Sequence, residues 1–415
     1  MKKTSLKESY GLLALMMGGM ILGTIVGAMW PGATMFKPLG QIFINLMFCI
    51  VIPMVFASIS SAVANMKNRK RAGKILGTTV ATFVVTGLFA GAVMFILVKI
   101  FPPVLTPWQG LEAVEMSAAS SVGDLIVGFF TAENFVTLIG PSSMLPLIVF
   151  SVLFGLSVNL AGESGAMVAR GLESVTACML QMVKIVTYYA PIAFFGIFAN
   201  LVATYSAEVI SDYARALLLY YPLCFVYIFT AWPLFAWIGA GKLGVKTMMQ
   251  NIARPAVTSL GTCSSVATIP TNMEVANKTG IPKDVSEMVL PLGATMHMDG
   301  SCFSCVLKIT FLFGVFGKDL GIENFFMIML VAVLSSVGMS GVPGGGYIGE
   351  LIMCSIFFPD QIAFAYPIAV VIGNLVDPPA TMINSAGDYV VSFMVARVVD
   401  GKDWLEKAVA AKEAE

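Results

Sequence analysis

Six long, mostly apolar runs occupy the first 240 residues of this 415-residue chain. A helix of about 20 apolar residues crosses the hydrocarbon core of a bilayer. Because the bilayer core offers no water to unpaired backbone groups, such runs predict helices that span it. The runs cover residues 10–30, 39–65, 75–101, 142–160, 174–204 and 214–238, and a shorter run at 123–138 adjoins the fourth. The pattern predicts an all-α membrane protein.

The shortage of charge excludes a soluble body. Charged residues make up 12% of the chain and hydrophobic ones 58%, whereas soluble domains carry about 25% charged residues. The formal net charge is zero, so no overall basic field favours nucleic acid as a partner. The first run is too long for a signal-peptide core and has no small-residue cleavage motif, so we expect an uncleaved first span.

Lysine and arginine positions predict the orientation. Basic residues gather at 2–7, 67–74, 242–254 and 402–412, whereas the loops after the third and fifth runs carry acidic residues. Basic loops stay on the cytoplasmic side. We therefore expect both termini in the cytoplasm and a multi-pass protein of the plasma membrane, the inner membrane if the source is bacterial.

The cysteines do not predict a metal or redox site. Cys302 and Cys305 form a C-x-x-C pair, but the chain has a single histidine. All seven cysteines lie in or beside apolar stretches, which is typical of small buried hydrophobic residues.

After residue 240 the apolar stretches are broken by Ser, Gly, Pro and Thr. The breaks fall at 263–270, 293–301, 335–346 and 377–388. Irregular backbone at membrane depth is tolerated where it is buried in protein or lines a watery cavity. We therefore expect the working site in the C-terminal part and a scaffold in the N-terminal half.

Two of the broken segments predict re-entrant hairpins. Ser264, Ser265 and Pro270 fit a helical hairpin whose tip offers N–H groups and hydroxyls to an anion, although a kinked helix is the alternative. The glycine-rich segment 338–346 cannot continue a helix. It predicts a second hairpin with a flexible tip that acts as a lid.

The other two segments place carboxylates inside apolar spans. Asp299 lies beside a glycine in a segment that predicts an unwound helix, where carbonyls and a carboxylate can bind a cation. A hydrogen-bonded structural role is the alternative for Asp299. On a helix, Asp377, Thr381, Asn384 and Asp388 share one face. Such a polar stripe within a bilayer indicates a functional site.

The order of these four segments resembles the glutamate/neutral amino-acid transporter family (dicarboxylate/amino acid:cation symporters), and more closely its neutral amino-acid branch. The resemblance covers nearly the whole chain. The segment from His297 to Ser301 stands where the family has Asn-Met-Asp-Gly-Thr, and 377–388 matches its Asp-x-x-x-Thr-x-x-Asn-x-x-x-Asp helix. It implies eight transmembrane helices, two opposed re-entrant hairpins with inverted repeats, a homotrimer, and an elevator movement of a transport domain against a scaffold.

The resemblance also divides the chain into segments. These are 1–75 (scaffold helices 1 and 2), 76–101 (transport-domain helix 3), 102–240 (scaffold helices 4 and 5 and transport-domain helix 6), 241–280 (first hairpin), 281–318 (unwound helix 7), 319–359 (second hairpin), 360–400 (helix 8) and 401–415 (cytoplasmic tail).

Site residues follow from the resemblance position by position. It implies sodium ligands at Gly293, Thr295, His297, Met298, Asp299, Ser336, Val337, Met339, Asn384 and Asp388. It implies substrate contacts at Ser264, Ser265, Ser301, Val342, Pro343, Gly346, Asp377, Ala380, Thr381 and Asn384. Among these, Asp377 matches the partner of the substrate amino group.

The residue at position 380 bears on the substrate. Members that take acidic substrates carry arginine where this chain has Ala380. An unpaired buried carboxylate costs several kcal/mol. We therefore predict a secondary transporter, not an enzyme, that takes up small neutral amino acids (alanine, serine, threonine or cysteine) with sodium across the lipid bilayer. The alternatives are a proton-coupled, acidic amino-acid or dicarboxylate symporter of the same fold, a passive anion channel, and, remotely, an intramembrane aspartyl enzyme.

The third, deepest sodium site departs from the family pattern. His297 replaces an asparagine, and Phe83, Thr86 and Gly87 stand where the family often has Tyr, Thr and Ser. We expect two sodium ions, with the third lost or weakened or replaced by a proton on His297. A satisfied core histidine is the alternative.

Lys308 and Glu350 are charged residues inside apolar runs that the family pattern does not explain. We hypothesise that they form an ion pair within the transport domain. The alternative is that Lys308 extends to the membrane surface.

Overall fold

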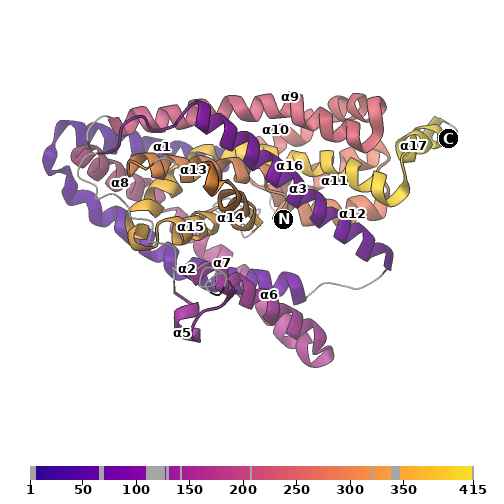
Figure 1. Ribbon diagram of the computed structural model, residues 1–415, viewed down its shortest axis with the longest axis horizontal. Coiled ribbons are helices and arrows are strands. Elements are labelled where there is room, and N and C mark those ends of the chain that lie inside the picture. The colour runs from indigo at the N-terminus through magenta and orange to yellow at the C-terminus, as the bar shows by residue number, and fades with distance from the viewer. Residues whose placement is uncertain are drawn as a thin grey trace.

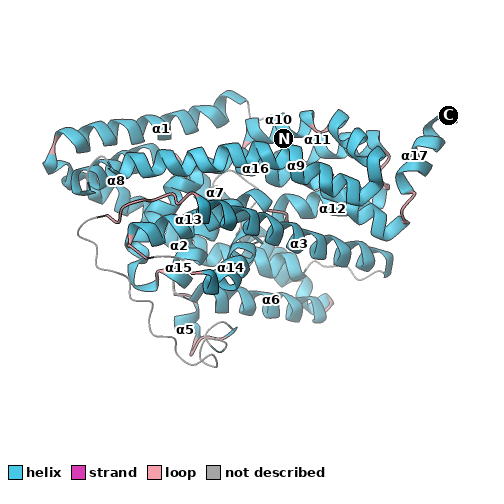
Figure 2. Ribbon diagram, turned by 45° about the horizontal axis from the view of Figure 1, so that its top comes forward, coloured by secondary structure: helices cyan, strands magenta, loops and turns pink. Residues whose placement is uncertain are grey.

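The computed structural model describes residues 6–64, 70–108, 127, 130–140, 143–205, 208–318, 321–337 and 346–413. Over these ranges the chain is helical and contains no strand (Figure 2). The elements are α1 (Leu6–Met29), η1 (Pro31–Phe36), α2 (Lys37–Ala64), α3 (Lys70–Ile100), α5 (Phe135–Leu138), α6 (Met144–Leu160), α7 (Glu163–Thr187), α8 (Ala190–Tyr205), α9 (Glu208–Asn251), α10 (Ala253–Thr262), α11 (Ser265–Thr279), α12 (Lys283–Met296), α13 (Asp299–Val315), η3 (Ile322–Asn324), α14 (Phe325–Val337), α15 (Tyr347–Phe357), η4 (Pro359–Gln361), α16 (Ile362–Asp400) and α17 (Trp404–Glu413).

Most of the predicted apolar runs coincide with single helices, namely α1, α2, α3, α6 and α9. The run at 174–204 is divided between α7 and α8 by a turn at Tyr188 and Tyr189. Pro191 explains this division, because proline has no N–H and its ring clashes with the preceding turn of a helix. In the run at 123–138, residues 123–126, 128 and 129 lie outside the described residues, and the described part contains the single turn of α5.

Several described helices are suited to a membrane by length and composition. Four stretches are long and apolar enough to cross it: Gly73–Ile100, Val209–Asn251, Lys283–Val315 and Pro359–Asp400. Shorter apolar helices occur at Ala14–Met29, Ile52–Ser61, Val149–Leu160, Ala190–Thr204 and Phe325–Ser336. The chain is thus built from apolar helices, and the number of eight spans stays a prediction.

The helices pack in two groups (Figure 1). In one, α1 lies along α8, and α2 contacts α6, α7 and α8. In the other, α13 and α16 pack on each other and are surrounded by α3, α10, α11, α12, α14 and α15, while α9 lies along α16. Helix α13 is buried almost from end to end, as is the middle of α16. Polar side chains on these two helices therefore face protein.

A glycine stripe brings α1 and α8 into close contact. Gly19, Gly23 and Gly27 follow one another at every fourth position, which places them on one face of α1. A Cβ added at each would lie under 3.0 Å from a backbone carbonyl oxygen of α8. Small residues at this spacing let helix backbones approach closely within a membrane.

We predict that Gly23→Leu separates α1 from α8. The added side chain has no space, and overpacking of this kind costs about 1–3 kcal/mol. Thermal unfolding in detergent should show a lower midpoint than the wild type. The matched control is Gly18→Ala, because a Cβ at Gly18 meets no atom within 4 Å. Equal midpoints for the two variants would contradict the close contact between the glycine stripe and α8.

Candidate substrate and cation site

A break in the buried helix pair α12 and α13 forms the centre of the site. Helix α12 ends at Met296, and α13 begins at Asp299. Between them His297 is extended (φ −88°, ψ 103°) and Met298 is non-helical (φ −134°, ψ 47°). The sequence-predicted unwound segment is therefore two residues long. It leaves the first amide groups of α13 without partners in their own helix.

Asn384 of α16 holds this break in place. Its Oδ1 accepts hydrogen bonds from the N–H groups of Gly300 (2.8 Å) and Ser301 (3.2 Å), which caps α13. Its Nδ2 donates to Ser301 Oγ (3.0 Å) and approaches Met298 Sδ (3.2 Å). A Cβ on Gly300 would lie 2.5 Å from the Ala380 carbonyl oxygen. Four sequence-predicted site residues, Met298, Ser301, Ala380 and Asn384, thus meet at one point.

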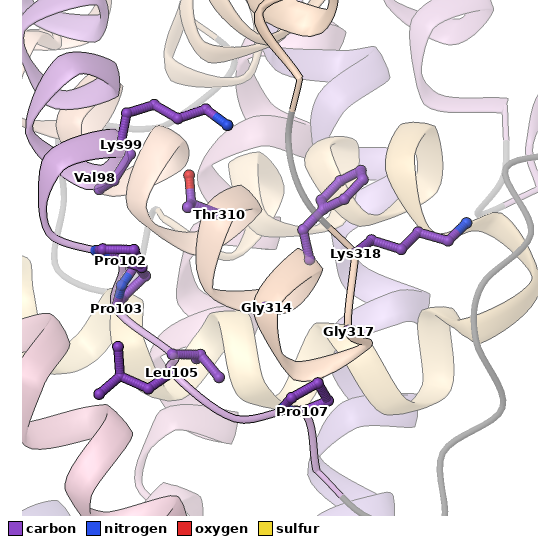
Figure 3. A pocket seen from close by; sticks show the side chains of 12 residues that line it. Val98, Lys99, Pro102, Pro103, Leu105, Pro107, Thr310, Gly314, Gly317 and Lys318 are labelled. Atoms are coloured by element: carbon purple, nitrogen blue, oxygen red, sulfur yellow. The ribbon is translucent and has the colours of Figure 1, made fainter.

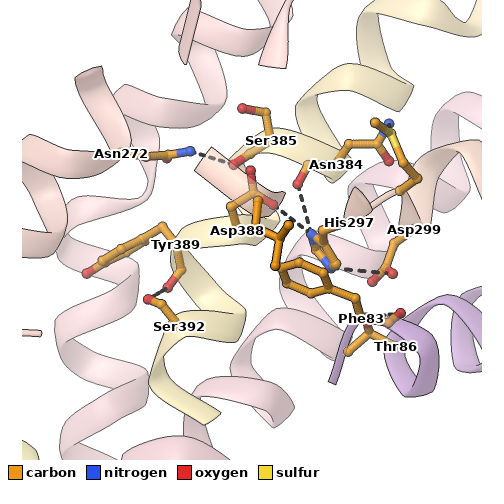
Figure 4. A network of polar contacts seen from close by, with 12 residues as sticks. Phe83, Thr86, Asn272, His297, Asp299, Asn384, Ser385, Asp388, Tyr389 and Ser392 are labelled. Carbon is orange, nitrogen blue, oxygen red and sulfur yellow. Dashed lines mark hydrogen bonds and ion pairs between the residues drawn. The ribbon is translucent and has the colours of Figure 1, made fainter. Parts of the chain in front are cut away.

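His297 connects two carboxylates that the resemblance assigns to different cation sites (Figure 4). Its side chain is 1% exposed. Nδ1 lies 3.0 Å from Asp388 Oδ1 and 3.1 Å from the Asn384 carbonyl oxygen. Nε2 lies 3.4 Å from Asp299 Oδ1. The imidazole therefore occupies the space between Asp299 and Asp388.

The residues packed around His297 fix the position of its ring. The Phe83 ring lies 5.0 Å away, centroid to centroid. A Cβ on Gly387 would lie 2.8 Å from His297 Cε1. Glycine at 387 therefore makes room for the imidazole, and His297 has little freedom to leave the two carboxylates.

Tyr227 of α9 donates a hydrogen bond to Asp299 Oδ2 (2.8 Å), a contact that sequence reasoning missed. Two further tyrosines of α9 act similarly: Tyr220 donates to the Gly300 carbonyl and Tyr221 to the Leu375 carbonyl, both at 2.8 Å. A buried tyrosine hydroxyl needs a partner. In the sequence, the sign of these contacts is the presence of three tyrosines within the apolar run 214–238.

The groups around Asp299 differ from those that the family pattern places there. Thr86 Oγ1 donates to the Phe83 carbonyl of its own helix (3.2 Å), and Gly87 faces Cys302 Sγ. Asp299 instead meets the Tyr227 hydroxyl and the His297 ring. Asp299 Oδ1 has no hydrogen-bond partner in the described residues, so only one oxygen of this carboxylate is held by a donor.

Asp388 is better suited to a cation. Its Oδ2 has no hydrogen-bond partner in the described residues. Gly293 packs directly against the carboxylate, where a Cβ would clash. The backbone oxygens of Gly293 and Asn384 lie in the same cluster, because they bond to the N–H and the ring of His297. Asp388 with these carbonyls would hold a sodium ion.

Three residues predicted for the second sodium site, Thr295, Ser336 and Val337, lie on α12 and α14. Thr295 Oγ1 donates to the Leu292 carbonyl (2.9 Å). Ser336 Oγ donates to the Ala332 carbonyl (2.5 Å) and accepts from Cys302 Sγ (3.4 Å). Val337 ends α14, whereas Met339 lies outside the described residues.

Helices α10 and α11 form a helix–turn–helix with its turn at Cys263, whose φ of 47° is left-handed. The structure thus has a hairpin here rather than a kinked helix. Ser264 Oγ accepts the Ala267 N–H (3.2 Å) and caps α11, which begins at Ser265. Asn272 Nδ2 donates to the Ser385 carbonyl (2.7 Å) and ties α11 to α16. The N-terminus of α11 is a suitable partner for a carboxylate.

The remaining substrate residues lie on α16 and beside α15. Thr381 Oγ1 donates to Asp377 Oδ1 (3.2 Å), so these two side chains share one face. Gly346 precedes α15. Val342 and Pro343 lie outside the described residues.

Comparison with known proteins identifies the family of this chain. The profile of the sodium:dicarboxylate symporter family matches residues 12–398. The chain belongs to this family. It is therefore a secondary symporter of multi-pass membrane type, and the family consists of transporters rather than enzymes.

Relatives in the sodium:dicarboxylate symporter family carry acidic substrates in their names. "C4-dicarboxylate transport protein 1" of Mesorhizobium japonicum is 28% identical over 91% of this chain and 80% of its own. "Proton/sodium-glutamate symport protein" of Geobacillus stearothermophilus is 26% identical over 91% and 92%. "C4-dicarboxylate transport protein" of Bacillus subtilis is 28% identical over 91% of both chains. These relatives correct the narrower assignment to a neutral amino-acid branch, because they support the family as a whole and not that branch.

Two cavities lie away from these residues. One, of about 250 Å³, opens between the ends of α3 and α13 and is lined by Val98, Lys99, Pro107, Thr310 and Lys318 among others (Figure 3). Another, of about 280 Å³, lies between α2, α8 and α16. None of the sequence-predicted site residues lines either cavity.

We predict that Tyr227→Phe destabilises the protein because it removes a donor from a buried carboxylate. Hydrogen bonds to charged groups contribute about 1.5–3 kcal/mol. Tyr221→Phe is the matched control, since it removes a hydroxyl that bonds to a neutral carbonyl. Thermal unfolding in detergent should show a larger decrease for Tyr227→Phe. A larger decrease for Tyr221→Phe would show that the Tyr227 hydroxyl does not stabilise the buried Asp299 carboxylate.

Proposed function

We propose that this protein is a symporter that moves a dicarboxylate or an acidic amino acid across the plasma membrane, driven by cations. The observation that carries this proposal is family membership over residues 12–398, with relatives named for C4-dicarboxylates and glutamate. The N-terminus of α11 supports it, because it offers amide groups to a carboxylate.

A small neutral amino acid is the second candidate substrate. Ala380 supplies no charge where members that take acidic substrates have arginine. Asp377 keeps a carboxylate, hydrogen-bonded by Thr381, for a substrate ammonium. This candidate predicts alanine, serine, threonine or cysteine as substrates.

Sodium is the coupling ion that we propose, with two ions rather than three. Asp388 and nearby carbonyls support one site, and the groups around Thr295 and Ser336 support another. The Asp299 position supports none, because Tyr227 and His297 already bond to it or face it. A proton is the alternative coupling ion, and one relative is named for both protons and sodium.

We further propose an elevator mechanism in a homotrimer with both termini in the cytoplasm. The two packing groups support it. Helices α1, α2, α6, α7 and α8 would form the scaffold, and α3 with α9 to α16 would form the transport domain.

Uptake by the purified protein in liposomes tests the proposed function. Labelled aspartate, glutamate, succinate, alanine, serine and threonine are compared with an inward sodium gradient, a proton gradient, or neither. We expect uptake of an acidic substrate that depends on sodium. Uptake of serine or alanine without acidic substrates would favour the second candidate instead. Uptake that is indifferent to sodium would contradict sodium coupling.

His297→Asn tests the number of ions. The shorter amide removes the ring from between Asp299 and Asp388 and frees the facing oxygens. We expect uptake to depend more steeply on sodium concentration than in the wild type. His297→Gln is the control, because its longer side chain still fills the space. Unchanged sodium dependence in an active His297→Asn variant would show that the imidazole does not exclude an ion.

A further inference from the structure

Lys308 and Glu350 form a buried ion pair between α13 and α15. Lys308 is 2% exposed and Glu350 is 3% exposed, and Lys308 is the one buried residue among the lysines and arginines whose side chains the structure describes. Transfer of two charges from water into protein is so costly that a hydrophobic pair of similar volume is usually at least as stable. The pair is therefore poorly explained as a device for stability alone.

The pair lies beside the substrate residues of α16. A Cβ on Gly373 would clash with Glu350 Oε1 and lie 3.1 Å from Lys308 Nζ. Gly373 shares one face of α16 with Asp377 and Ala380, four and seven residues later. Four residues of helix rise about 6 Å. The pair is thus one helical turn from Asp377.

The spacing of residues along α13 agrees with this position of the ion pair. On α13, Lys308 follows Ser301 by seven residues, so both lie on the face that contacts α16. Ser301 meets Asn384 at one end of this contact, and Lys308 meets Gly373 at the other. Asp377 and Ala380 lie between the two ends.

Both members of the pair have hydrogen-bonding capacity to spare. A lysine ammonium has three donors, and Glu350 Oε1 is its one hydrogen-bond partner in the described residues. Glu350 Oε2 is buried without a hydrogen-bond partner. Buried polar groups in proteins usually have their hydrogen bonds satisfied, so the unused capacity of this pair needs an explanation, and a ligand group would supply one.

We propose that Lys308 binds the distal carboxylate of the substrate and replaces the arginine that is missing at position 380. Glu350 positions the ammonium in the absence of substrate. The substrate carboxylate would take the unused donors of Lys308, while an ammonium group, where the substrate has one, would pair with Asp377 one turn away. This inference rests on the proposed function, because it assigns the residue that selects an acidic substrate.

The decisive variant removes the two charges together. Lys308→Met with Glu350→Gln leaves no unpaired buried charge, so it should fold where a single substitution would not. In liposomes we expect the KM for aspartate or succinate to rise by about tenfold or more, as the loss of a charged hydrogen bond implies. Arg254→Gln is the matched control, because it breaks the exposed Arg254–Glu274 ion pair of the first hairpin, and it should keep the wild-type KM.

Two further variants separate substrate binding from a structural role. The exchange Lys308→Glu with Glu350→Lys keeps an ion pair but moves the positive charge to α15. A structural pair predicts wild-type unfolding and wild-type KM, whereas our proposal predicts a raised KM for acidic substrates. Adding Ala380→Arg to the doubly neutral variant should restore acidic uptake.

The possible failures are distinguishable. Wild-type protein that takes up serine but no acidic substrate overturns the proposed function, and this role of Lys308 with it. Wild-type protein that takes up aspartate or succinate, with an unchanged KM in the doubly neutral variant or in the exchange variant, overturns the role of Lys308 alone.

Discussion

The burial of carboxylates between α13 and α16 is the constraint on which the rest of the structure depends. Asp299 and Asp388 lie inside a bundle built from apolar residues, where an uncompensated charge is very costly. One imidazole faces both carboxylates, and a tyrosine of α9 supplies a further donor. The break at His297 and Met298 follows from this arrangement, because a continuous helix could not place the ring between the two acids.

Much of the site was predictable because it is encoded in short, polar segments of an apolar chain. Asp299, Asn384 and Asp388 stood out by type alone, and the structure brings them together. The tyrosines of α9 did not stand out, since a tyrosine in an apolar run is usually a core residue. Their role depends on tertiary packing of α9 against α13 and α16, which no local pattern reveals.

The division of one predicted apolar run into α7 and α8 has a similar origin. Hydropathy alone does not distinguish one long helix from two that meet at a turn, and Pro191 was the local signal.

The substrate shows another limit of prediction from the sequence. Ala380 indicates the absence of a charge at one position, but a charge can come from a different helix, as we propose for Lys308 of α13.

The close contact of α1 and α8 has a mechanical consequence. At three successive turns a glycine of α1 meets a backbone carbonyl of α8. A lengthwise slip of α1 would bring bulkier residues against these carbonyls at Gly23 and Gly27, so the stripe favours movement of α1 and α8 together. A displacement between the two packing groups is easier along boundaries that lack such close backbone contacts.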